Sequence, residues 1–153
     1  MQLWRIAQSR WALDTSCAGA RKHGGRWNPP GLGAMYAGTT IELCALEMFT
    51  HLASVDHPPL KLVAIDVPDT EDLIFRPRLD DIPAGWAALP VATASQQFGG
   101  QWLAQARQLV MLLPSVIVPE ATNALINPAH PAFADIRLRA VRDFQFDSRM
   151  FKG

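Results

Sequence analysis

The stretch MYAGTTIELCALEMFTHL, residues 35–52, joins a strand pattern to a helix pattern. Residues 35–37 are a strand candidate around the only tyrosine of the chain, Tyr36. From residue 41 to about 52, apolar residues recur at helical spacing, and the Thr-Thr pair in front of them can cap the first turn. The sequence therefore predicts a short strand that leads directly into a helix over 41–52.

The patterns on both sides of this stretch predict the other elements. Residues 14–33 hold many small residues, glycines and a Pro-Pro pair, which indicate a long ordered loop with at most short strands. Residues 68–92 are rich in Pro and Asp and have no clear period, so their role stays open. Strands are expected over 3–7, 61–67, 109–113, 116–118 and 138–146, and helices over 95–108 and, briefly, 131–136.

The composition indicates one compact domain over residues 1–153. Hydrophobic residues make up 49% of the 153 residues and charged residues 18%, which is enough apolar content for a core and too much for disorder. Lys plus Arg (14) balance Asp plus Glu (14), so no basic excess is available to neutralise a phosphate backbone. We expect no direct binding of nucleic acid.

The sequence also favours a cytoplasmic protein without a metal. The polar N-terminal residues lack the apolar run of a secretory signal, and no run is long enough to span a membrane. Two cysteines, Cys17 and Cys44, offer neither a disulfide framework nor a metal motif, and the four histidines are scattered. A reducing cytoplasm, no membrane contact and no metal site are the expectations.

Glu47 is the most informative single residue of the predicted helix. The helix is apolar on nearly every side, and on a helical wheel Glu47 falls in a stripe with Leu43 and His51. Glu42 lies three residues after Thr39 and can serve a capping box, whereas Glu47 has no such structural explanation. Glu47 is either a functional acid or an ordinary solvent-facing glutamate.

The loop string HGGRWNPPG, residues 23–31, places Arg26 beside two glycines and Trp27. Glycines let a ligand approach the backbone closely, and a guanidinium offers a two-pronged donor to phosphate oxygens. The alternative is a turn in which Arg26 stacks on Trp27. Tyr36 could stack on a flat heterocycle or pack in the core.

The string LPSVIVPEATNALINPAHP, residues 113–131, places Ser115 between two apolar runs. A serine nucleophile needs a nearby base and an elbow turn, and no Gly-x-Ser-x-Gly surrounds this serine. Ser115 is therefore interpreted as a hydrogen-bonding residue, either in a site or at a strand end.

Several of these motifs together resemble the RES domain, which is named for its Arg, Glu and Ser. They are Trp4-Arg5, GGRWN at 24–28, Tyr36, Glu47 and PSVIVPEATNALINPAHPAF at 114–133. The resemblance runs from residue 3 to about 147 and carries no motif over 68–92. It implies an α+β fold similar to ADP-ribosyltransferases, a single RES domain with mixed small β-sheets, flanking helices and a cleft for NAD.

The resemblance also implies roles for residues. Arg5 and Arg26 would be the cleft arginines, Tyr36 the aromatic, Glu47 the acid and Ser115 the family serine, with NAD as the substrate. Glu47, Arg26 and Ser115 are the expected catalytic residues, and Arg5, Arg26, Tyr36 and Ser115 the expected NAD-binding residues. The chemistry agrees, because a carboxylate stabilises the oxocarbenium-like ribose that forms when nicotinamide leaves.

The family further implies a bacterial toxin that depletes cellular NAD by hydrolysis or phosphorolysis and arrests growth. Its partner would be an antitoxin with an Xre-type helix-turn-helix part, whose C-terminal segment blocks the cleft. Two alternatives stay open: a mono-ADP-ribosyltransferase that modifies a cellular protein, and a non-catalytic module that only docks its partner. Products identified by mass would separate the first two, and purified protein that leaves NAD intact would favour the third.

Overall fold

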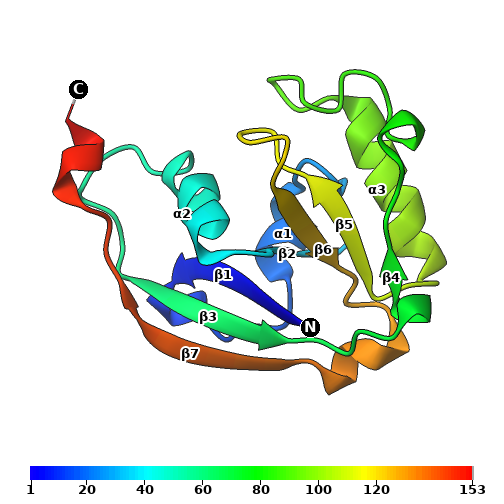
Figure 1. Cartoon of the computed structure of the whole chain (residues 1–153), viewed down its shortest axis with the longest axis horizontal. Helices are drawn as coiled ribbons and strands as arrows, with labels where there is room; N and C mark the ends of the chain where they lie inside the picture. Colours follow the sequence, from blue (N-terminus) through cyan, green and yellow to red (C-terminus); the bar gives the residue numbers. More distant parts are fainter. Residues whose placement is uncertain (153) are drawn as a thin grey trace.

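The computed structural model describes residues 1–152, an α+β arrangement of strands and helices around a central sheet (Figure 1). The strands within these residues are β1 (Gln2–Gln8), β2 (Met35–Gly38), β3 (Leu60–Asp66), β4 (Ile74–Phe75), β5 (Val110–Pro114), β6 (Thr122–Ile126) and β7 (Arg137–Phe144). The α-helices are α1 (Ala18–His23), α2 (Ile41–Phe49) and α3 (Thr93–Gln105). The expected α+β class is confirmed.

The strands follow the order β4-β5-β6-β2-β1-β3-β7, with β4 parallel to β5 and every other pair antiparallel. The join between β1 and β2 is narrow, because only Trp4 and Gly38 pair there. By contrast, β1 pairs with β3 over its whole length. The sheet therefore consists of two halves, β4-β5-β6-β2 and β1-β3-β7, which meet at one residue pair.

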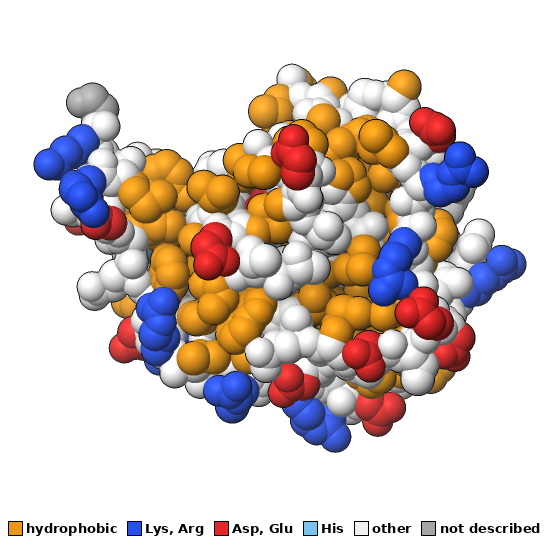
Figure 2. All heavy atoms as spheres, viewed as in Figure 1, with side chains coloured by type: hydrophobic (Ala, Val, Ile, Leu, Met, Phe, Trp, Pro, Cys, Tyr) orange, Lys and Arg blue, Asp and Glu red, His pale blue; other side chains and the backbone are white. Residues whose placement is uncertain are grey.

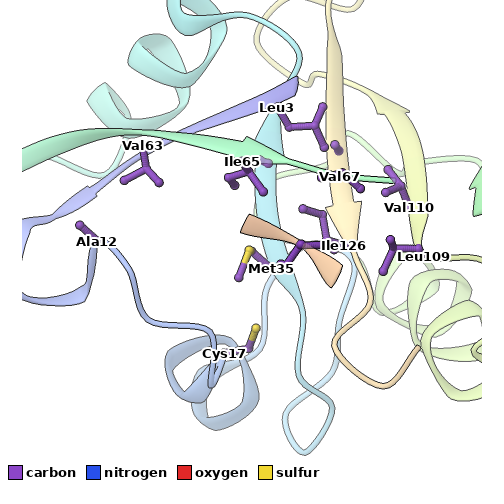
Figure 3. Packing of buried hydrophobic residues seen from close by; sticks show 13 residues of the cluster. Leu3, Ala12, Cys17, Met35, Val63, Ile65, Val67, Leu109, Val110 and Ile126 are labelled. Atoms are coloured by element: carbon purple, nitrogen blue, oxygen red, sulfur yellow. The ribbon is translucent and has the colours of Figure 1, made fainter. Parts of the chain in front are cut away.

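Alternation along the strands separates the core into clusters on the two faces of the sheet. Leu3, Val63 and Ile126 belong to a cluster that runs across both halves on one face (Figure 3). On the other face, α2 covers the half that contains β1 and β3 with Cys44 against Ile6. The other half is covered separately, by a cluster that includes α3 and the loop after α1. On this face, the layer of α2 and the layer of α3 are separate, and a space remains between them.

Two glycines explain how α3 fits against the loop after α1. A Cβ at Gly99 would overlap the carbonyl of Trp27, and one at Gly100 would lie 3.0 Å from the ring of Pro29. Glycine is unfavourable inside a helix by roughly 0.5–1 kcal/mol, which makes a close approach of backbone the physical reason for both positions. The helix therefore packs directly on the loop that carries Arg26.

The structure corrects several local expectations. Residues 14–33 contain the helix α1 and no named strand, residues 116–118 are irregular and not a strand, and α2 ends at Phe49 rather than near 52. The strand β6 lies in a segment for which no strand was expected, and 68–92 contributes the two-residue strand β4. Long-range pairing of β6 with β2 and β5 creates that strand, which local pattern does not reveal. None of the helices within residues 1–152 is long and apolar enough to cross a membrane.

Candidate active site

Two adjoining cavities lie on the face of the sheet where the layers of α2 and α3 are separate. The larger has a volume of about 690 Å³ and the smaller about 200 Å³. The outline of the molecule is notched between the part that carries α2 and the part that carries β5 and β6 (Figure 2). Four residues line both cavities: Tyr36, Glu47, His51 and Asn123. These four side chains mark the place where the cavities meet.

The helix α2 presents Glu47 to this meeting point. Its first turn is capped by Thr40, whose Oγ1 accepts a hydrogen bond from the Leu43 amide at 3.2 Å. Leu43 and Cys44 are buried on the helix, one turn before Glu47, which is half-buried at the edge of that packed face. The helix is therefore fixed in rotation, and Glu47 points into the cleft.

The carboxylate of Glu47 is held in place through one of its two oxygens. Oε1 accepts a hydrogen bond from the Ser115 hydroxyl at 2.9 Å and another from the Asn123 side-chain amide at 2.6 Å. Within residues 1–152, Oε2 has no hydrogen-bond partner. The carboxylate is thus oriented by two neutral donors on one oxygen and keeps the other oxygen for a ligand. No cation neutralises it at these contacts.

Ser115 serves the carboxylate and not the open cavity. It follows β5 directly, is fully buried, and is not among the residues that line either cavity. Its Oγ accepts hydrogen bonds from the amides of Ile117 and Val118 at 3.1 and 3.2 Å and donates to Glu47. This turn geometry aims the hydroxyl proton at Glu47. The expected hydrogen-bonding character of Ser115 agrees with this geometry.

Tyr36 lies on the floor of the cleft with its hydroxyl tied to the loop of residues 24–30. The hydroxyl donates to Asn28 Oδ1 at 2.7 Å and accepts from the Trp27 amide at 3.0 Å. A Cβ at Gly25 would lie 2.5 Å from this hydroxyl, so the contact requires glycine there. Burial of the hydroxyl raises the pKa of Tyr36 to about 12. The ring, with the residue 37% exposed, remains available on the cavity side.

Arg26 lines the larger cavity and connects it to the segment before α3. Its Nη1 donates to the carbonyl oxygens of Trp86 at 2.7 Å and Ala88 at 3.0 Å. These two bonds orient the guanidinium, which keeps further N–H donors for a ligand. Arg26 is therefore an oriented cation on the same cavity as Glu47.

Arg5 lies on the smaller cavity and is held mainly by backbone. Its Nη2 donates to the carbonyls of Trp11 and Ala12, both at 2.8 Å, and of Asp14 at 3.3 Å. Its Nε is buried without a hydrogen-bond partner among the described residues. Burial lowers the pKa of Arg5, because the charged form loses water. The structure thus brings Tyr36, Glu47 and Ser115 together, with the two arginines in different cavities.

Three residues of the site had no assigned role in the sequence interpretation. Asn123 is the second residue of β6 and precedes the apolar residues of that strand, and its polar side chain was the available signal once the strand is known. Asn28 is fully buried, and its amide donates to three backbone carbonyls, one in α1 and two after Asn28, which fixes the side chain that binds the Tyr36 hydroxyl. His51 follows Glu47 by four residues and was grouped with it on the helical wheel. Within residues 1–152, no group of three or more His, Cys, Asp or Glu is placed to hold a metal ion.

Comparison with known proteins agrees with this arrangement. Residues 2–147 match the family described as the RES domain. The chain belongs to the RES domain family. It is 43% identical to the "Prs ADP-ribosylating toxin" of Sphingobium sp. (strain YBL2), over 97% of this chain and 96% of that protein. It is 32% identical to "Toxin Res" of Yersinia enterocolitica, over 98% and 99% of the two chains.

A solved structure has the same fold as this RES domain. The crystal structure of the M. tuberculosis MbcT-MbcA toxin-antitoxin complex contains a chain that matches with a TM-score of 0.73, over 98% of this chain and 86% of that one. Sequence identity is 18%. At that identity the likeness concerns the fold alone.

Proposed function

We propose that this RES domain is the toxin of a bacterial toxin–antitoxin pair and that it consumes NAD by breaking the bond between nicotinamide and ribose. The observation that carries the proposal is the arrangement of Glu47 where the two cavities meet: Ser115 and Asn123 hold its Oε1, and Oε2 has no hydrogen-bond partner within residues 1–152. Such a carboxylate stabilises positive charge that develops on a ribose ring.

The proposed reaction needs no proton donor for the leaving group. When the bond between ribose C1′ and the pyridinium nitrogen breaks, both electrons go to that nitrogen and nicotinamide departs neutral. The ribose becomes an oxocarbenium-like cation, which Glu47 stabilises. A nucleophile then forms a new bond to C1′: water, which loses a proton and leaves ADP-ribose, or phosphate, which leaves ADP-ribose 1″-phosphate.

The remaining site residues support this chemistry by position. Arg26, on the larger cavity, supplies the two-pronged donor that a pyrophosphate requires. Tyr36 offers its ring to the nicotinamide ribose region, with its hydroxyl already bound to Asn28. Arg5 adds positive charge from the smaller cavity. Ser115 acts by orienting Glu47 rather than by attacking the substrate.

Transfer of ADP-ribose to a protein is a second candidate, favoured by one comparison. The Sphingobium relative, 43% identical over nearly the whole chain, is named an ADP-ribosylating toxin. The same cation at C1′ would then be captured by a side chain of an acceptor protein. Intact-protein and peptide mass spectrometry of cell extract incubated with labelled NAD separates this outcome from free ADP-ribose or its phosphate.

The proposed partner is an antitoxin with an Xre-type helix-turn-helix part, whose C-terminal segment blocks the cleft. The solved structure that shares the fold is a toxin-antitoxin complex, and the cleft of this chain is open to a partner from solvent. With a formal net charge of +0, the chain should reach operator DNA only through that partner. The proposed place of action is the cytoplasm, where NAD is available.

Expression of the chain alone in a bacterium tests the proposal. Cellular NAD should fall before growth stops, and co-expression of the antitoxin should restore both. Growth arrest with an unchanged NAD level would refute NAD consumption as the mechanism. A mobility shift of operator DNA by the isolated chain at micromolar concentration would refute the division of labour between the two proteins.

A further inference from the structure

The segment of residues 83–92 forms part of the wall of the larger cavity. Leu89 and Val91 line that cavity although they are 80% and 39% exposed. Apolar side chains so exposed at the rim of a cleft are typical of surfaces that bind a ligand. This segment carries no motif that the family resemblance uses.

The segment is anchored to the loop that carries the proposed pyrophosphate-binding cation. The two carbonyls that accept from Arg26 Nη1 belong to Trp86 and Ala88, directly before Leu89. The Trp86 ring also stacks on Trp27, with ring centroids 6.0 Å apart and an interplanar angle of 22°. Arg26 and the exposed Leu89 are therefore held next to each other by the same contacts.

A second set of apolar side chains lines the larger cavity from the turn between β5 and β6. Val116 and Ile117 belong to it, and Ile117 is 39% exposed. The Ser115 hydroxyl fixes this turn through the Ile117 amide, so the wall is rigid on that side. Segment 83–92 and this turn both lie in the upper part of Figure 1, and both line the larger cavity. The outer part of the cavity thus has two apolar walls from different elements.

We propose that these two walls form the subsite for the purine base of the dinucleotide, with Leu89 and Val91 as specificity-determining residues. The inference rests on the proposed function, because NAD supplies both the pyrophosphate for Arg26 and a purine beyond it. A purine presents two flat faces of low polarity, which fit between apolar side chains, while its edges stay in water. The base would enter beside the guanidinium that binds the adjoining phosphates.

Segment 83–92 then has two roles in the site. Its apolar side chains bind the end of the substrate that does not react, and its carbonyls hold Arg26 in the direction of the pyrophosphate. Binding energy from such a remote group lowers KM or, when it is used to orient the reacting bond, raises kcat.

Titration calorimetry with two non-reacting probes, ADP and inorganic pyrophosphate, tests the subsite. Both offer a pyrophosphate to Arg26, and only ADP has the purine. The wild-type protein should bind ADP at least tenfold more tightly than pyrophosphate. In the double variant Leu89→Ser/Val91→Ser, this preference should fall to within about twofold, since deleting apolar contacts to a ligand costs on the order of 10-fold or more in affinity.

A matched control is Leu79→Ser, because Leu79 is 65% exposed and is not among the residues that line the larger cavity. Leu79→Ser should keep the wild-type preference for ADP, and all variants should unfold at the wild-type temperature. Equal binding of ADP and pyrophosphate by the wild type, or an unchanged preference in the double variant, would overturn the subsite. Either result leaves NAD consumption standing, whereas tight ADP binding without any NAD loss would refute the proposed function and not the subsite.

Discussion

Replacing Glu47 by Gln removes one charge and leaves the geometry of the site in place. The side-chain oxygen of the amide can still accept from Ser115 and Asn123, as Oε1 does now at 2.9 and 2.6 Å. The amide nitrogen takes the position of Oε2, which has no hydrogen-bond partner among the described residues. The fold and the cleft should therefore survive Glu47→Gln, and any loss of activity reports the missing charge.

The expected loss follows from the electrostatics of a half-buried site. A carboxylate about 4 Å from a unit positive charge contributes about 4 kcal/mol at an effective dielectric constant near 20. Each 1.36 kcal/mol is a factor of ten in rate, so Glu47→Gln should lower the rate of NAD loss by roughly 10²–10³. The assay is a single-turnover measurement of nicotinamide release, with the unfolding temperature as the test of folding.

Glu42→Gln is the matched control for this substitution. Glu42 lies in the first turn of the same helix, is exposed, and lines neither cavity, so its charge is remote from the substrate. Glu42→Gln should retain the wild-type rate. A folded Glu47→Gln protein with activity within a few-fold of the wild type would refute the reasoning about Glu47.

Three further predictions concern the loop, the helix packed on it and the tyrosine. Arg26→Lys should weaken NAD binding at least tenfold in calorimetry, because an ammonium cannot replace a two-pronged donor; unchanged affinity would make Arg26 structural. Gly99→Ala should lower the free energy of unfolding by about 1–3 kcal/mol, since its Cβ overlaps the Trp27 carbonyl, whereas Gly19→Ala, with open space around it, should not destabilise the protein. As the only tyrosine, Tyr36 can be titrated by near-ultraviolet absorbance, with an expected midpoint near pH 12 when folded and about 10 when unfolded. Because the pKa is higher in the folded protein, the contribution of the protonated Tyr36 to folding stability is complete below pH 10 and is lost as pH rises towards 12. A midpoint near 10 in the folded protein would contradict the burial of the Tyr36 hydroxyl.

Local sequence rules predicted the helix that carries the acid but not Asn123, one of the two groups that hold it. The apolar spacing and the capping threonine of α2 are properties of neighbouring residues, and both are present in the structure. The partners of Glu47 lie 68 and 76 residues away in the chain. Asn123 gains its position from the pairing of β6 with β2 and β5, so no local pattern could show that its amide meets Glu47.

In the long segment before β2, the sequence predicted irregular chain where the structure has a short helix. Small residues, glycines and prolines indicate irregular chain, and most of 14–33 follows that rule, yet residues 18–23 form the short helix α1. This helix has no side-chain cap, and Cys17 before it has a left-handed backbone, so the usual start signals are missing. The side chain of Asn28 reaches back to the Ala20 carbonyl of this helix. Tertiary contact, and not propensity, decides the conformation of this segment.

The candidate site is assembled across the narrow join of the sheet. Glu47 comes from α2, which packs on the half that contains β1 and β3, whereas Ser115, Asn123 and Tyr36 come from the other half. Only one residue pair connects β1 to β2, so the hydrogen bonds of Glu47 with Ser115 and Asn123 are themselves part of what relates the two halves. On the face that carries α2 each half keeps its own apolar layer, whereas on the opposite face one apolar cluster runs across both halves and joins them. Because both donors to Glu47 lie on the β5-β6 side, a change that moves α2 away from that side would remove both hydrogen bonds from the carboxylate at once.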